Sequence, residues 1–451
     1  MTTKESEVRN MPRISGVPII GALPSLWKDT LGFFLRAGTE HPHIVKIELG
    51  PSRMHLVSHP DGVKHVLQDN QRNYVKKYDQ AKPLLGDGLV TSEGELWRRQ
   101  RRLIQPAFHK QKLAELLPMM TGATQEMLDG WRKRGGADEP LDLAREIMLL
   151  TQTIILRTMF STDITENAEA IADAFSTTLE HLNLSIVAPF PILHALPTPA
   201  NRRFREAMLV IDKAVYGMIA ERRESGVKRG DLLQMLIDAR DEETGQGMSD
   251  KQMHDEVLTI FLAGHETTAA LLGWTFYLLG QNPEAAERLQ AEIDSTLNGS
   301  APTLEQIGSM QYTGQVLHEA LRLYPPAWMF ARTPVEDDVI GGYPVPAGSM
   351  IMLSPFVTHR LPQVWDEPDR FDPDRFAPGA DPTRPRYAFF PFGGGPRLCI
   401  GNNFALMEAP AILSMILHNF KFRLAEGYTV KTLPAATLRP RPGLHVHIQP
   451  R

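Results

Sequence analysis

The feature that most constrains this sequence is one long apolar segment, from Val257 to Gly280, with polar residues near its middle. The segment is about as long as a membrane span, but His265, Glu266, Thr267 and Thr268 interrupt it, and polar groups buried without partners are costly. We therefore expect a core helix of a soluble protein. A helix that is apolar on all sides must be covered by neighbouring elements, so a large helical fold is expected around it.

Helical patterns dominate the rest of the chain. They run through 95–133, 141–160, 164–185, 200–224, 228–240, 250–297, 303–324 and about 400–418. Alternating runs at 44–49 and 54–57 predict a small sheet, and short strands are expected near the turns at 341–346. No internal repeat or long polar linker divides the chain. We expect a mainly α fold with a smaller β portion, forming one catalytic domain over 1–451 with a disordered tail at 1–11.

Composition excludes several classes of protein. The chain has 451 residues, of which 42% are hydrophobic, and it can bury a large core. Its net charge of −5 gives no general attraction to nucleic acid. A single cysteine excludes an internal disulfide and suits a reducing compartment, and the polar N-terminus has no signal peptide or membrane anchor. We expect a soluble, cytoplasmic protein.

The single cysteine, Cys399, lies in a glycine-rich loop that a helical pattern follows directly. Glycines let the backbone pass close to a flat cofactor, and the start of a helix favours a thiolate over a thiol. A lone cysteine is more often a small buried apolar residue, but its neighbours argue against that interpretation here. Phe392 could pack against a cofactor ring, and Arg397 could pair with a carboxylate at its edge. The loop therefore predicts a metal-binding thiolate.

This loop resembles the haem-binding loop of the cytochrome P-450 superfamily, whose pattern is Phe-x-x-Gly-x-Arg-x-Cys-x-Gly. The matching positions are Phe392, Gly395, Arg397, Cys399 and Gly401. The segment 263–268 is similar to the family's oxygen-binding motif at every position. The resemblance implies a triangular helical prism with small N-terminal and C-terminal sheets. It also implies haem b with Cys399 as axial thiolate, and O2 as co-substrate.

The resemblance assigns roles within the long helix. Ala263 and Gly264 would lie beside the haem, and Gly264 would allow a local bulge. Thr267 would steady bound oxygen through its hydroxyl, while Glu266 would relay protons from solvent. His265 is expected to be structural. The alternative is a kinked core helix whose polar groups are all paired.

A structural triad is also implied by the resemblance. Glu319 and Arg322 are three residues apart and share one helix face, and Arg375 would be the third member. The family usually has Glu before this arginine, whereas this chain has Asp374. We expect the trio to be structural rather than catalytic.

Haem carries two propionates, which need cationic or hydrogen-bonding partners when they are buried. The positions that match the family's propionate partners are Trp97, Arg101, Arg332 and Arg397. The other arginines of the 98–102 stretch are expected to form a solvated face. With the lysines at 110 and 112, they could dock an acidic electron carrier.

By resemblance, the substrate pocket is mostly apolar and suits an apolar small molecule. The expected lining residues are Leu84, Leu85, Val90, Leu179, Leu182, Phe261, Leu262, Trp328, Met329 and Phe330. For any one of them, core packing is the alternative. Fatty acids, terpenoids, steroids and polyketides all remain open.

The sequence thus predicts a haem-thiolate monooxygenase that hydroxylates or epoxidises an apolar molecule. Because the chain ends soon after the cysteine helix, we expect electrons from a separate ferredoxin or flavodoxin with its reductase, NAD(P)H acting indirectly. We expect a monomer that binds no nucleic acid. One alternative is a peroxide-dependent peroxygenase or isomerase of the same fold, disfavoured because Glu266 and Thr267 are both present. Another is a haem-based binding or sensing protein, disfavoured by the oxygen-binding motif at 263–268.

Overall fold

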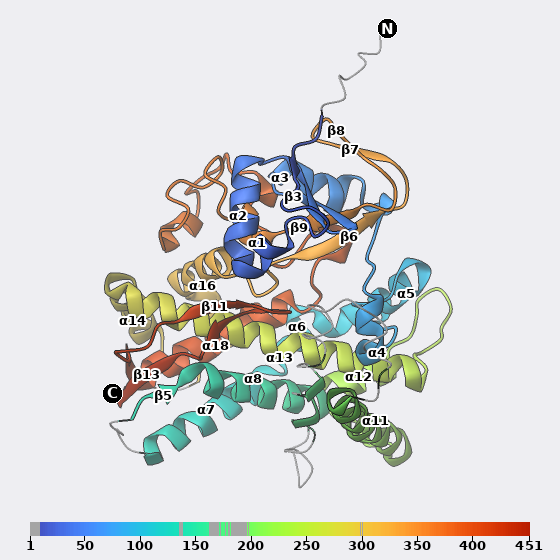
Figure 1. The fold of residues 1–451 in the computed structure, drawn as a ribbon. Helices are drawn as coiled ribbons and strands as arrows, with labels where there is room; N and C mark the ends of the chain where they lie inside the picture. Colours follow the sequence, from blue (N-terminus) through green and yellow to red (C-terminus); the bar gives the residue numbers. More distant parts are fainter. Residues whose placement is uncertain are drawn as a thin grey trace. The chain divides into compact units, whose positions relative to one another are not determined.

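The computed structural model describes residues 10–134, 139–161, 171, 173–175, 177–178, 181, 196, 198–297, 299 and 301–451. The chain folds into two compact units. The first, the sheet unit, contains Met1–Lys77 and His318–Cys399, and the second, the helical unit, contains Tyr78–Leu317 and Ile400–Arg451. Each unit is therefore built from stretches that are far apart in the sequence (Figure 1).

The sheet unit is organised around a six-stranded sheet in the order β1-β2-β3-β9-β6-β4. Its strands are β1 (Arg13–Ile14), β2 (Ile44–Leu49), β3 (Ser52–Val57), β4 (Tyr74–Val75), β6 (Phe330–Pro334) and β9 (Met350–Leu353). The predicted strands at 44–49 and 54–57 are confirmed, and they pair as an antiparallel hairpin. Their apolar residues alternate toward the core, where Val45, Ile47 and Leu56 are fully buried.

Short helices and turns complete the sheet unit. They include α1 (Leu23–Lys28), α2 (Thr30–Glu40), α3 (Pro60–Lys64), α17 (Pro355–Thr358) and the hairpin of β7 (Asp338–Ile340) with β8 (Tyr343–Val345). The last turns of α16 (Gln311–Leu323) also belong to this unit. A stretch of turns then leads from α17 to the cysteine loop.

The helical unit is built around α13 (Asp250–Gln281). This helix packs against α8 (Leu143–Phe160), α11 (Pro199–Ser225) and α18 (Asn402–Asn419) (Figure 1). Among the described helices it is the one long and apolar enough to cross a membrane, yet 83% of its most apolar window is buried inside the protein. The expected core helix is therefore confirmed.

Other helices of this unit are shorter than the sequence patterns suggested. They are α4 (Lys82–Leu85), α5 (Gly94–Ile104), α6 (Lys110–Ala114), α7 (Leu117–Arg134), α12 (Leu232–Asp238), α14 (Pro283–Thr296) and α15 (Leu304–Ser309). The pattern at 250–297 is two helices, because Pro283 cannot continue α13 and instead starts α14. The pattern at 95–133 is likewise divided, with Pro106 in the first break and Pro118 at the start of α7. The predicted helix at 164–185 lies mostly outside the described residues.

Two small sheets end the helical unit. One has the order β10-β13-β5, from β10 (Phe420–Leu424), β13 (His445–Pro450) and β5 (Leu141–Asp142). The other is a hairpin of β11 (Lys431–Pro434) and β12 (Leu438–Arg441), called the terminal hairpin below. The mainly α fold with small sheets is confirmed.

Candidate active site

The cysteine loop is held by its own backbone. The Cys399 N–H donates to the Phe392 carbonyl at 3.0 Å, and the Gly395 N–H donates to the Tyr387 hydroxyl at 3.2 Å. Gly395 has φ +61°, and a Cβ there would lie 1.8 Å from the carbonyl oxygen of Leu67. Only glycine fits this position without rearrangement. Cys399 itself is exposed at the end of the loop.

A histidine that sequence reasoning missed supports the same loop. The His359 Nε2 accepts the N–H of Phe390 at 3.0 Å, and its Nδ1 lies 3.3 Å from the carbonyl oxygen of Arg322. Burial, together with the charge of Arg322, lowers the pKa of His359 well below its usual value. The neutral ring can therefore accept at Nε2 and donate from Nδ1. It connects α16 to the strand-like segment that leads into the cysteine loop.

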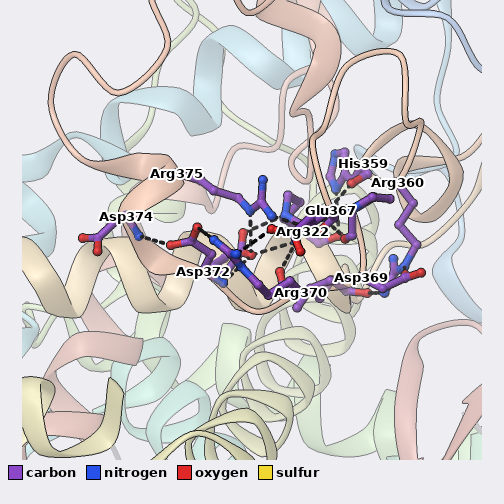
Figure 2. Close-up of polar contacts among 12 residues, drawn as sticks. Arg322, His359, Arg360, Glu367, Asp369, Arg370, Asp372, Asp374 and Arg375 are labelled. Carbon is purple, nitrogen blue, oxygen red and sulfur yellow. Dashed lines mark hydrogen bonds and ion pairs between the residues drawn. The ribbon is translucent and has the colours of Figure 1, made fainter. Parts of the chain in front are cut away.

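The structure brings the predicted triad together around Glu319. Figure 2 shows two of its members, Arg322 and Arg375, among their polar neighbours. Arg322 donates twice to the Glu319 carboxylate, at 2.6 and 2.7 Å, and the Arg375 Nε lies 3.5 Å from it. Glu319 also accepts the Asp372 N–H at 2.9 Å. Arg322 donates further to the carbonyl of His359 at 2.9 Å. Glu319 and Arg322 thus have several partners each, although the buried Arg375 Nε makes no hydrogen bond to the described residues, and this geometry suits a structural role.

The middle of α13 presents a narrow accessible stripe in an otherwise buried helix. Ala263 is exposed and Gly264 and Thr267 are partly exposed, whereas Glu266 and Thr268 are buried. The spacing i, i+1, i+4 places the accessible residues on one face. The Thr267 hydroxyl donates to the Ala263 carbonyl at 2.8 Å. The helix is α-helical throughout this segment, so the local bulge that Gly264 would allow is not formed.

Glycine at position 264 has a different structural reason. A Cβ there would lie 2.9 Å from the Cδ1 of Ile155 on α8. The missing side chain therefore allows α8 and α13 to pack closely at the level of the accessible stripe.

Glu266 is 2% exposed, and it is reached from the terminal hairpin. Its Oε1 lies 3.1 Å from the Arg439 Nη1, and the Thr437 hydroxyl is nearby, although neither Oε1 nor this hydroxyl has a hydrogen-bond partner within the described residues. Burial raises the pKa of Glu266 above its usual value, and Arg439 and Thr437 oppose this shift. Nothing close to Glu266 in the sequence identifies Arg439 as a partner.

Sequence reasoning also missed a second acid next to this motif. Glu408 on α18 is 1% exposed and shares a hydrogen bond with Thr268. Burial raises the pKa of Glu408 to about 8, so its carboxyl is mainly protonated at neutral pH. A single acid inside the apolar helix 402–419 was the signal that could have identified it.

The four predicted propionate partners lie in different units. Trp97 and Arg101 are one turn apart and half-buried on α5, in the helical unit, and the Arg101 Nε donates to the Gln105 side chain at 3.2 Å. Arg332 on β6 and Arg397 in the cysteine loop belong to the sheet unit. Their role as propionate partners stays a prediction.

The basic stretch of α5 is not simply a solvated face. Arg99 donates to the Gln252 side chain at 3.0 Å and to the Gly247 carbonyl at 2.8 Å. Arg102 pairs with the buried Asp241 at 3.1 Å. These two arginines attach α5 to the first turn of α13 and to the segment before it, whereas Arg98 pairs with Glu95 on its own helix.

The residues predicted to line a substrate pocket have different environments. Leu84, Leu85 and Leu262 are buried, and Val90, Trp328, Met329 and Phe330 are partly exposed. Phe261 is fully buried and stacks on Phe175 at 3.7 Å between ring centroids, and its role in the pocket stays a prediction. Leu179 and Leu182 lie outside the described residues.

The donor set fits an iron porphyrin. Within the described ranges, no group of three or more His, Cys, Asp or Glu side chains is placed to hold a metal ion by itself. Haem iron takes most of its ligands from the porphyrin, so one accessible thiolate is a sufficient protein ligand. In the helical unit, Ala263 and Gly264 leave part of α13 accessible without bulky side chains.

Comparisons with known proteins agree with this geometry. The sequence pattern of the cytochrome P-450 family matches residues 11–447. Cyclooctatin synthase of Streptomyces melanosporofaciens is 38% identical, over 96% of this chain and 93% of that protein. Cyclooctat-9-en-7-ol 5-monooxygenase of the same organism is 39% identical, over 92% and 90%. Pentalenene oxygenase of Streptomyces avermitilis is 35% identical, over 94% and 93%.

Proposed function

Because this chain belongs to the cytochrome P-450 family, we propose that it inserts one oxygen atom from O2 into an apolar cyclic terpenoid, with Cys399 as the haem ligand. The observation that carries this proposal is the exposed Cys399 at the end of a glycine-dependent loop. A thiolate needs access to the metal it binds, and a backbone-held loop fixes the direction of the sulfur.

Bound haem would supply an iron that activates O2, and the thiolate would push electron density toward it. The chain's own residues hold and orient this group. Arg332 and Arg397 in the sheet unit, and Trp97 and Arg101 in the helical unit, would neutralise or hydrogen-bond the propionates. The bond from the Cys399 N–H to the Phe392 carbonyl keeps the loop closed around the ligand.

Proton supply is assigned to Glu266 and Thr267. Glu266 is buried, and burial raises its pKa, so its carboxyl holds a proton more readily than an exposed glutamate does. Arg439 is 28% exposed and connects this acid to the solvent side. The Thr267 hydroxyl, held at the Ala263 carbonyl, retains lone pairs that can accept a hydrogen bond, and its O–H can rotate toward a bound molecule.

The substrate class is inferred from the relatives and from the predicted apolar pocket. The names of these relatives refer to cyclooctatin, cyclooctat-9-en-7-ol and pentalenene. Cyclic terpenoids present large apolar surfaces with few polar groups, and an apolar pocket binds them by burying that surface. Fatty acids, steroids and polyketides are the competing outcomes of the test.

Electrons are proposed to come from a separate ferredoxin or flavodoxin with its reductase, so that NAD(P)H acts indirectly. We place the protein in the cytoplasm and expect it to act as a monomer. These assignments are tested by reconstitution with each carrier and by the mass of the purified protein in solution.

The experiment is a binding and turnover screen. Purified haem-loaded protein is titrated with terpenes, fatty acids and steroids while the haem absorption band is recorded. Ligands that shift the band are then incubated with O2 and a reduced ferredoxin system. We expect a terpenoid to give the tightest shift and a product heavier by one oxygen atom. Turnover that requires peroxide and ignores the reduced carrier would contradict the proposal, as would exclusive binding of fatty acids.

A further inference from the structure

Glu266 is surrounded by groups from several elements, and only some of them act on its charge. His265 is buried, and its Nδ1 bonds the Phe261 carbonyl at 2.7 Å, while burial lowers the pKa of this histidine so that it stays neutral. From α18, Glu408 reaches the neighbouring Thr268. The charged group that approaches Glu266 itself is Arg439, at 3.1 Å.

The terminal hairpin holds Arg439 in place through a second contact with α13. The Trp274 Nε1 donates to the carbonyl of Leu438, next to Arg439, at 2.9 Å. Leu438 is fully buried, and it pairs with Pro434 across the hairpin. Trp274 and Glu266 are eight residues apart, which is about 12 Å along a helix. The hairpin is therefore attached to α13 at two levels.

Comparison with Glu408 isolates what Arg439 contributes. Both acids are buried in the helical unit, Glu266 on α13 and Glu408 on α18, and a threonine side chain lowers the pKa of each. Among the described residues, no charged group shifts the pKa of Glu408, and burial raises this pKa to about 8. Glu266 has Arg439, whose charge pulls its pKa back toward the usual range. An opposite charge at this distance makes a buried carboxyl able to ionise near neutral pH.

We infer that Arg439 is a positioning residue for proton delivery, which holds the Glu266 carboxyl beside the accessible stripe of α13 and keeps it able to exchange its proton. The inference rests on the proposed function of Glu266 and extends it to the hairpin. Without Arg439, Glu266 would stay protonated and would lose its fixed orientation. Proton transfer would then become limiting at pH values where the unmodified protein still works.

The direct test is an infrared titration of carboxyl groups in the haem-loaded protein across pH. Glu266→Gln assigns the Glu266 band, and Glu408→Gln removes the band of the neighbouring acid. In Arg439→Gln we expect the midpoint of Glu266 titration to rise by about 1–3 pH units. Arg439→Lys, which keeps the charge, should restore most of the original midpoint.

A matched control is available on the same strand. Arg441 is exposed on β12, so Arg441→Gln removes the same charge from the hairpin without touching Glu266. We expect its midpoint to equal that of the unmodified protein. An unchanged midpoint in Arg439→Gln, or an equal rise in Arg441→Gln, would overturn the inference.

A second readout separates positioning from general stability. The readout is the fraction of consumed electrons that appears in oxidised product, measured across pH. At equal haem content, this fraction should decline at a different pH in Arg439→Gln than in the unmodified protein. Failure of the unmodified protein to bind haem through a thiolate would instead contradict the proposed function. The infrared titration needs no turnover, so the two failures are distinguishable.

Discussion

Glu319 in the sheet unit and Glu266 in the helical unit are both buried acids, but their surroundings differ. Glu319 accepts two bonds from Arg322 and one from the Asp372 backbone. Glu266 has one arginine at ion-pair distance and a threonine. Burial raises the pKa of both carboxyls. Glu319 is held by several hydrogen bonds, whereas Glu266 can still accept a further hydrogen bond.

The difference separates acids that hold the fold from acids that can move protons. The hydrogen bonds and ion pairs around a carboxylate that holds the fold favour its charged form, against burial, and hold it in one orientation. An acid with few partners can change protonation without breaking a network, as a proton relay requires. Glu408 also has few partners, because its Oε2 has no hydrogen-bond partner within the described part of the chain, but burial keeps its carboxyl mainly protonated.

The largest expected effect comes from breaking the ion pair of Glu319 and Arg322. Arg322→Met leaves Glu319 without its main cation and removes the donors to the carbonyls of His359 and Arg370. Breaking a buried ion pair costs about 3–5 kcal/mol, so the free energy of unfolding should fall by that amount, as measured by urea denaturation. Arg370→Met removes an exposed arginine that pairs with Glu367 and Asp372, and it should change stability little. Equal losses in the two variants would contradict a special role for Arg322.

The next effect concerns proton delivery. Glu266→Gln keeps the size and polarity of the side chain but removes its titration, and Thr267→Ala removes the neighbouring hydroxyl. In each variant we expect product formation to fall by about 100-fold, with electrons lost to peroxide, because general acid catalysis contributes at least this factor. Haem content should be unchanged. Product and peroxide are measured per electron consumed, and fully coupled turnover in either variant would refute the assignment.

Gly395→Ala tests the rigidity of the cysteine loop. The new Cβ would meet the Leu67 carbonyl oxygen, and φ is +61°, so we expect strain of about 1–3 kcal/mol and weaker thiolate ligation. Gly393 also has a positive φ, +73°, but nothing lies within 4 Å of a Cβ there. Gly393→Ala therefore measures the destabilisation caused by the positive φ without a steric clash. The carbon monoxide spectrum of the reduced protein should be disturbed more in Gly395→Ala than in Gly393→Ala.

Glu408→Gln should have the smallest effect on turnover, while its effect on stability depends on pH. Burial raises the pKa of Glu408 to about 8 from an ordinary 4.5, so between these values the folded state holds a proton that the unfolded chain releases. Stability of the unmodified protein therefore falls as pH rises through this window. Glu408→Gln has no carboxyl to titrate at this position. As pH rises, its free energy of unfolding should exceed that of the unmodified protein by a margin that grows by at most about 1.4 kcal/mol per pH unit and levels off above the pKa of Glu408. Product formation per electron should stay close to that of the unmodified protein.

Sequence patterns predicted the features that lie close together along the chain. The cysteine loop, the stripe of α13 and the pair Glu319 and Arg322 are each defined by fixed spacing on one element. Partners contributed by distant segments were missed. Glu266 and Arg439 are 173 residues apart, and no local pattern joins them.

Boundaries were predicted less well than the presence of helices. Pro283 divides the pattern at 250–297 because proline tolerates the first turn of a helix but not its interior. The apolar spacing continues across this break, so a prediction from periodicity alone treated the two helices as one. The expected bulge at Gly264 was wrong for a related reason, since close packing against Ile155 already accounts for the glycine.

The central claim is that Cys399 binds haem iron as a thiolate. It is tested most directly by the absorption spectrum of the reduced protein after exposure to carbon monoxide. Thiolate ligation predicts a strongly red-shifted main band that disappears in Cys399→His while haem remains bound. A reduced, carbon monoxide-treated protein without this red shift, or a shift that persists in the histidine variant, would contradict the account.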